Sequence, residues 1–173
     1  MTLTEIEALI RDVPDFPKPG IVFKDITPLL ANPEALGATV EHLAARVEDL
    51  NVDGILAIEA RGFIFGAALA QTLSLPMHLV RKKGRLPRES IGVRYELEYG
   101  FEHLEIHTGV IERGGRYLIV DDLLATGGTA AAVAKLVRGE GATVAACAVV
   151  IELTFLDGRR ALDGCPVVSL ITY

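Results

Sequence analysis

The chain has 173 residues, 50% of them hydrophobic, with 17 Lys and Arg residues against 23 Asp and Glu residues and a net charge of −6. A chain of this length can bury a complete hydrophobic core as a single domain without disulfides or metal ions to stabilise it. The acidic balance argues against a general nucleic-acid binder or a protein of anionic membrane surfaces, because both present basic surfaces.

The N-terminal residues predict two helices separated by an extended segment. Apolar residues at helical spacing predict a helix over residues 4–13, which the following prolines end. Residues 21–23 are expected to be extended. Asn32-Pro33-Glu34 combines an N-cap, a proline in the first turn and an early acid, so a second helix should run to about Leu50.

The remainder alternates apolar strands with helices. Strands are predicted at residues 54–58, 77–80, 117–120, 144–151 and 167–170, and helices at 63–73 and 129–138. Strands that are apolar on both faces and are separated by helices indicate a parallel sheet covered on both sides. The expected fold is therefore α/β, a central parallel sheet with helices on both faces, in a single domain over residues 1–173.

Residues 91–107 depart from this pattern. They alternate polar and apolar side chains around Gly100, which is typical of a half-exposed antiparallel hairpin. This hairpin is expected to project from the domain as a flexible flap.

The strongest chemical signal lies in residues 117–129. A buried strand delivers Asp121 and Asp122 to the carboxyl edge of the sheet, where open α/β folds bind ligands. The next turn joins glycines and hydroxyls to a helix start, so its backbone N–H groups favour a phosphate; its residues are Ala125, Thr126, Gly127, Gly128 and Thr129. This segment therefore offers two acceptors for vicinal hydroxyls and, a few residues later, a phosphate-binding turn. The ligand that carries these groups together is a ribose 5-phosphate. The alternative is a phospho-acceptor receiver domain that binds Mg²⁺ through paired aspartates.

Residues 117–129 also resemble the phosphoribosyl pyrophosphate (PRPP) motif of type I phosphoribosyltransferases. Further segments narrow the resemblance to the adenine phosphoribosyltransferases and extend it over essentially the whole chain. These segments are residues 14–17, 19–28, 59–63, 80–87, 97–100 and 151–153.

Two of the resembling segments are expected to hold pyrophosphate. Residues 59–63 resemble the family's pyrophosphate turn, which implies a non-proline cis peptide at Ala60-Arg61 and a role for Arg61. Residues 81–88 hold five basic side chains and no acid, and Arg81, Lys82 and Arg85 are the expected ligands. The alternatives are an ordinary strand-to-helix turn and a solvated basic loop, in which Arg88 is a bystander.

Two other segments are expected to read the base. By resemblance, Glu98 hydrogen-bonds or protonates adenine N7, and Tyr99 helps to close the site. Val22, Phe23 and Lys24 match the adenine-recognition segment within an N-terminal region of residues 1–35, where an aromatic ring can stack on the base. Phe23 as plain core is the alternative, and Lys24 stands where some family members have arginine.

The resemblance implies that adenine and PRPP react to give AMP and pyrophosphate in purine salvage. It also implies a homodimer and Mg²⁺ carried by PRPP or pyrophosphate, with no direct protein ligand. A hypoxanthine or guanine phosphoribosyltransferase and a PRPP-sensing regulatory protein are the alternatives. The acidic start of the chain lacks a signal peptide's pattern, and the lone Cys147 and Cys165 suit a reducing compartment, so a cytoplasmic protein without nucleic-acid or membrane partners is expected.

Overall fold

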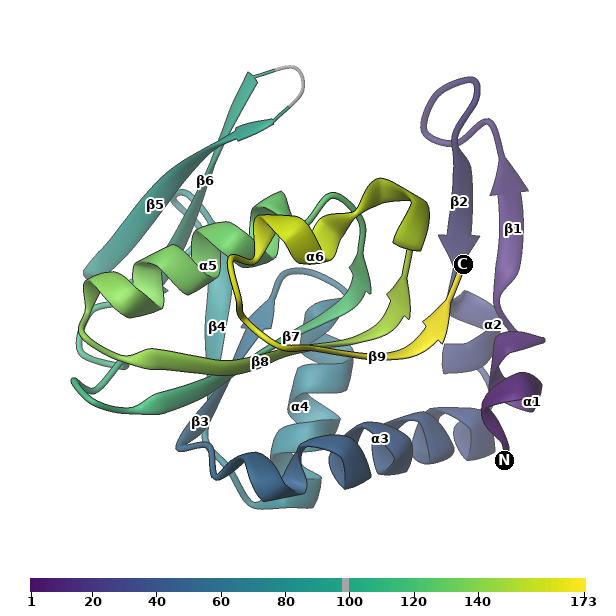
Figure 1. The fold of residues 1–173 in the computed structure, drawn as a ribbon, viewed down its shortest axis with the longest axis horizontal. Helices are drawn as coiled ribbons and strands as arrows, with labels where there is room; N and C mark the ends of the chain where they lie inside the picture. Colours follow the sequence, from purple (N-terminus) through teal and green to yellow (C-terminus); the bar gives the residue numbers. More distant parts are fainter. Residues whose placement is uncertain (98–99) are drawn as a thin grey trace.

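The structure, a computed structural model, describes residues 1–97 and 100–173. Within these residues, seven strands form one sheet in the order β5-β6-β4-β3-β7-β8-β9, and two further strands, β1 and β2, form a separate hairpin (Figure 1). The strands are β1 (Arg11–Pro14), β2 (Val22–Asp25), β3 (Gly54–Ile58), β4 (Met77–Lys82), β5 (Ser90–Leu97), β6 (Gly100–His107), β7 (Arg116–Leu124), β8 (Thr143–Glu152) and β9 (Val167–Thr172). The helices are α1 (Leu3–Glu7), α2 (Thr27–Leu30), α3 (Pro33–Val47), α4 (Gly62–Leu73), α5 (Gly128–Gly139) and α6 (Gly158–Ala161), with 3₁₀ turns η1 (Glu48–Leu50) and η2 (Thr154–Leu156).

Helices cover both faces of the sheet, as the sequence predicts. Neighbouring strands among β4, β3, β7, β8 and β9 pair in parallel. The side chains of β3 alternate between the two faces: Ile55 and Ala57 pack with α3 and α4, whereas Leu56 and Ile58 pack with α5. Every residue of β3 is buried, so the apolar run in the sequence reflects a strand enclosed by two helical layers.

The helix predicted from residue 33 is confirmed, together with its cap. The side chain of Asn32 accepts hydrogen bonds from the N–H groups of Glu34 and Ala35, both at 3.1 Å. The helix ends at Val47, and η1 extends the helical segment to Leu50.

The helix predicted over residues 4–13 is wrong in its second half. Helix α1 ends at Glu7, and Arg11–Pro14 forms β1, in which Val13 lies opposite Phe23 of β2. Pairing with a strand that lies farther along the chain outweighs the local helical spacing, which contributes little in so short a segment.

The hairpin predicted over residues 91–107 is present, but its base belongs to the main sheet. Strand β6 pairs antiparallel with β4, with Arg81 opposite Glu105 and Lys82 opposite Leu104. Leu104 and Ile106 are buried in the core, while the end of β5 and the start of β6 project beyond α5 (Figure 1). The flexibility expected of this flap stays a prediction.

Cys147 and Cys165 are buried in the core layer beneath α5, where desolvation raises the pKa of both thiols. Among the described residues, no helix has the length and apolar character that a membrane crossing requires.

Candidate active site

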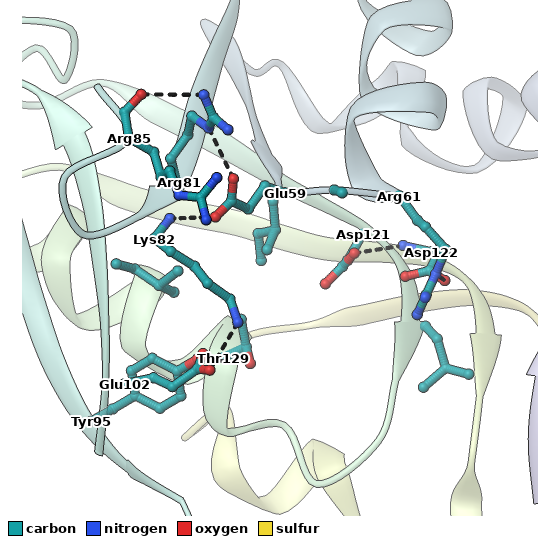
Figure 2. A pocket seen from close by; sticks show the side chains of 14 residues that line it. Glu59, Arg61, Arg81, Lys82, Arg85, Tyr95, Glu102, Asp121, Asp122 and Thr129 are labelled. Atoms are coloured by element: carbon teal, nitrogen blue, oxygen red, sulfur yellow. Dashed lines mark hydrogen bonds and ion pairs between the residues drawn. The ribbon is translucent and has the colours of Figure 1, made fainter. Parts of the chain in front are cut away.

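A cavity of about 650 Å³ opens where β3, β4 and β7 end. Since these strands are parallel, their carboxyl ends meet at one edge of the sheet and carry their side chains to a common point. Figure 2 shows Arg81, Lys82 and Arg85 on one side of the cavity, called the basic side below, and Asp121 and Asp122 with Arg61 on the other, called the acidic side. Its polar lining consists of Glu59, Arg61, Arg81, Lys82, Arg85, Tyr95, Glu102, Asp121, Asp122 and Thr129.

Glu59, the residue that follows β3, binds two residues on the basic side of the cavity. Its carboxylate accepts a hydrogen bond from Arg81 Nε at 2.9 Å and one from the backbone N–H of Lys82 at 2.7 Å. Although burial opposes the charged form, these bonds hold the pKa of Glu59 below its usual value. Arg81 also donates to the carbonyl of Arg85 at 3.2 Å. The partly buried Glu59 carboxylate thus binds the Arg81 guanidinium and the backbone of Lys82.

A second set of contacts connects the hairpin to this basic side. Tyr95 donates to Glu102 Oε2 at 3.0 Å, and Lys82 Nζ pairs with Glu102 Oε1 at 2.9 Å. The bond from Lys82 lowers the pKa of Glu102, with burial opposing it and the tyrosine hydroxyl assisting. The Tyr95 hydroxyl also lies 3.2 Å from Thr129 Oγ1. These contacts tie β5 and β6 to the first turn of α5.

The acidic side is formed by Asp121 and Asp122 of β7. Asp122 pairs with Arg61 Nε and is 6% exposed, and its backbone N–H donates to Asp121 Oδ1 at 2.9 Å. Desolvation, together with the negative charge of Asp122, raises the pKa of Asp121 well above the usual value. An acceptor pair for two hydroxyl groups therefore faces the basic side chains across the cavity.

A smaller cavity of about 90 Å³ adjoins the acidic pair, and all five residues of the predicted phosphate turn line it. Within this turn Gly127 has a φ of 80°, in the left-handed region, and α5 begins at the next residue, Gly128. The N–H groups of a first helical turn lack partners within the helix, so they are available to an anion.

The predicted base-reading residues lie in β2, outside the lining of the large cavity. Val22 is 49% exposed, and Phe23 is half-buried with its ring centroid 5.2 Å from the guanidinium carbon of Arg61. Lys24 pairs with Asp12 at 2.6 Å and lies 3.6 Å from the ring centroid of Tyr173. Phe23 is therefore not plain core, and the Lys24 ammonium is already engaged.

Several sequence-based expectations need correction or completion. A non-proline cis peptide is present, but it joins Glu59 to Ala60, so the prediction for Ala60-Arg61 is wrong by one bond. Glu98 and Tyr99 lie outside the described residues.

Sequence reasoning gave no role to Glu59 as a partner of basic residues or to Tyr95, and the pattern offered Glu102 only as an equally exposed alternative to Glu98. The register of the hairpin could have found Tyr95 and Glu102, because it places them directly opposite each other.

Comparison with known proteins identifies the family. The phosphoribosyl transferase domain matches residues 27–167. An adenine phosphoribosyltransferase of Carboxydothermus hydrogenoformans is 54% identical over 169 residues, which are 98% of this chain and 99% of the relative. The chain belongs to the adenine phosphoribosyltransferases.

Solved adenine phosphoribosyltransferases also have this fold. The crystal structure of the enzyme from Thermoanaerobacter pseudethanolicus matches with a TM-score of 0.97 and 52% identity, covering 99% of this chain and 100% of the other. The enzyme from Saccharomyces cerevisiae, solved with adenine and an imino-altritol bisphosphate, matches with a TM-score of 0.91 and 38% identity over 97% of both chains. The resemblance and the fold class stated from the sequence are confirmed.

Proposed function

We propose that the chain transfers the phosphoribosyl group of PRPP to adenine, producing AMP and pyrophosphate in purine salvage. The observation that carries this proposal is the sequence of groups across the site: basic side chains, then two aspartates, then a phosphate turn. PRPP presents pyrophosphate, ribose hydroxyls and a 5′-phosphate in the same order. Family membership and the yeast enzyme's binding of adenine with a bisphosphate support the assignment.

The reaction exchanges one bond at the anomeric carbon of the ribose. The C1′–O bond to pyrophosphate breaks, its electron pair leaves with the pyrophosphate, and adenine N9 forms the new bond to C1′ as it loses its proton. Displacement passes through a state with positive charge on the ribose. Asp121 and Asp122 are proposed to accept hydrogen bonds from the ribose hydroxyls and to balance that charge, while the 125–129 turn holds the 5′-phosphate.

The departing pyrophosphate carries negative charge that the protein must stabilise. We assign this role to Arg61, Arg81, Lys82 and Arg85, which line the same cavity. Arginine suits the role because its planar guanidinium can donate two parallel hydrogen bonds to a phosphate. The hairpin over this side would exclude water, which otherwise could take the place of adenine.

Mg²⁺ is the cofactor proposed from the family. No group of three or more His, Cys, Asp or Glu side chains suited to a metal occurs among residues 1–97 and 100–173. The basic side chains and the two aspartates around the cavity suit an Mg²⁺ that arrives on the phosphates of PRPP or pyrophosphate and needs no direct protein ligand, while Asp121 and Asp122 hold the ribose hydroxyls. A bound Mg²⁺ would supply positive charge to the phosphates.

Base recognition is proposed from the N-terminal segment and the flap. We propose that Phe23, whose ring centroid lies 5.2 Å from the guanidinium carbon of Arg61, stacks on adenine, and that the backbone of Val22 and Lys24 contacts the edge of the base. Glu98 is proposed to hydrogen-bond or protonate N7, and Tyr99 to help close the site. Glu98→Gln and Glu98→Leu should each lower kcat with adenine by about 100-fold, the leucine variant at least as strongly. Full activity of Glu98→Leu would exclude this role.

The homodimer, the cytoplasmic location and the absence of nucleic-acid partners stay predictions.

The deciding experiment incubates the protein with PRPP, Mg²⁺ and adenine, hypoxanthine or guanine in turn and separates the products by chromatography. AMP and pyrophosphate in equal amounts, with little product from the 6-oxopurines, are expected. Equal use of hypoxanthine would favour the hypoxanthine or guanine enzyme. No turnover, combined with a PRPP-dependent shift of nucleic acid on a gel at low salt, would favour the regulator.

A further inference from the structure

The phosphate turn rests directly on another backbone segment that the proposed reaction does not use. A Cβ atom added to Gly127 would overlap the carbonyl oxygen of Gly158, at the start of α6. A Cβ added to Gly158 would in turn overlap the carbonyl oxygen of Ala125. The two segments of the chain therefore touch backbone to backbone at both points, and neither contact leaves room for a side chain.

An ion pair fixes the segment that carries Gly158. Glu152 ends β8 and is 3% exposed. Its carboxylate accepts hydrogen bonds from Arg159 Nε and Nη2, both at 2.6 Å, and from Ser169 Oγ at 2.6 Å. Arg159 Nη1 also donates to the carbonyl of Val167 at 3.1 Å. Arg159 is thus bound to β8 and β9 at the position that follows Gly158.

The pair is suited to a fixed geometry. The guanidinium donates two hydrogen bonds to one buried carboxylate, which restricts both its distance and its orientation. The bonds from Arg159 and Ser169 lower the pKa of Glu152 against the opposing effect of burial, so the carboxylate stays charged at neutral pH.

Neither Gly158 nor Arg159 lines either cavity of the site. Any effect of these residues on substrate must therefore pass through the 125–129 turn. We propose that Gly158, held by the Arg159–Glu152 pair, is a positioning residue that supports the phosphate turn from behind and sets the direction of its amides. This inference rests on the proposed binding of the PRPP 5′-phosphate by that turn.

Gly158→Ala tests the contact directly. The φ of Gly158 is not in the left-handed region, so alanine suits the backbone there, and the added Cβ would disturb only Ala125 of the turn and the adjoining Leu124 side chain. Gly37→Ala is the matched control, because Gly37 lies inside α3 and has no atom within 4 Å of an added Cβ. We expect Gly158→Ala to raise KM for PRPP and Kd for ribose 5-phosphate by about 30-fold. KM for adenine and Kd for pyrophosphate should change less than about twofold, and Gly37→Ala should match the wild type.

Arg159 provides a second test that does not depend on the glycine. Arg159→Ala should raise Kd for ribose 5-phosphate by about 10-fold, and Arg159→Lys should recover part of the loss because it keeps one charged bond. Arg138→Ala is the control, since Arg138 is 46% exposed, close to the 52% of Arg159, and pairs with Asp163 at 4.0 Å.

Calorimetric titration measures Kd for ribose 5-phosphate and so tests the turn. Product analysis with the wild type measures AMP formation and so tests the proposed reaction. Selective loss of ribose 5-phosphate affinity supports the inference. It is overturned by wild-type affinity in folded Gly158→Ala and Arg159→Ala, or by parallel losses for ribose 5-phosphate and pyrophosphate. If Gly158→Ala does not fold, the Arg159 series decides alone. Wild type that binds ribose 5-phosphate but forms no AMP would contradict the proposed reaction and not this inference.

Discussion

The two ends of the proposed PRPP site offer positive charge by different means. At the pyrophosphate end, Arg81 and Lys82 pair with Glu59 and Glu102 and supply full charges on side chains. At the 5′-phosphate end, no basic side chain among the described residues lines the smaller cavity, and the turn provides backbone N–H groups at the start of α5.

This difference determines how each end can be disrupted. A side chain can be removed singly, and acidic neighbours compete with the ligand for it. A backbone turn keeps its donors in almost every variant and is lost only when its conformation or its support changes. The consequence is that the pyrophosphate end should respond to charge substitutions and the 5′-phosphate end to steric ones.

The largest effect is expected for Gly127→Ala. Alanine would have to adopt a φ near 80° and would overlap Gly158, so the turn would have to move. We expect kcat/KM for PRPP to fall by at least about 100-fold in steady-state assays. Gly139→Ala, where an added Cβ meets no atom within 4 Å, should leave it unchanged. Normal activity of Gly127→Ala would show that the turn does not hold the phosphate.

Arg81→Ala is expected to have the next largest effect, at the other end. Removing a charged donor to phosphate costs about 1.5–3 kcal/mol, so kcat/KM for PRPP should fall by about 10- to 100-fold. Arg88→Ala is the matched control in the same basic segment, because Arg88 lines a separate small cavity with His78 and His107. Equal losses in both variants would mean that the segment acts through its general charge.

The acidic pair should give a pH dependence. The raised pKa of Asp121 means that it binds a proton at a higher pH than an ordinary aspartate. The protonated carboxyl is a weaker acceptor for ribose hydroxyls, so kcat/KM for PRPP should fall about 10-fold per pH unit as the pH drops below that pKa. Asp121→Asn should be less active, and at low pH its kcat/KM should fall only as far as protonation of PRPP itself requires. An unchanged profile in Asp121→Asn would exclude Asp121 as the titrating group.

The smallest effect concerns competition for Lys82. Glu102→Gln removes a carboxylate that pairs with the Lys82 ammonium in the free site, and such partly exposed pairs are worth about 0.2–1 kcal/mol. The pyrophosphate concentration that inhibits the variant should therefore be about threefold lower than the concentration that inhibits the wild type. Glu96→Gln, an exposed position of the same hairpin, is the control. Weaker inhibition of Glu102→Gln would mean that Glu102 positions Lys82 for the ligand.

The sequence predicted the elements whose pattern is local. Strand β7, its two aspartates and the glycine turn are consecutive, so the sequence alone specifies the strand, the edge and the helix start. The same holds for α3, whose Asn32 cap directly precedes its first turn. Alternation along residues 91–107 indicated the hairpin, although its pairing with β4 required a partner far away in the chain.

Contacts between distant segments could not be predicted in the same way. Strand β1 forms because β2 pairs with it, and nothing within residues 11–14 indicates that partner. The support of Gly127 by Gly158 depends on two segments that lie about thirty residues apart and meet only in the folded chain. Glu152 stood among the residues that resemble the family, but its pairing with Arg159 is visible only in three dimensions.

Calorimetric titration of ribose 5-phosphate and pyrophosphate, each into wild type, Gly127→Ala and Arg81→Ala, most directly tests the claim that the two ends are separate and differently built. Gly127→Ala should lose affinity for ribose 5-phosphate by about 100-fold and keep its affinity for pyrophosphate, and Arg81→Ala should show the reverse with a loss of about 10-fold or more. Equal losses of both ligands in both folded variants would contradict the account.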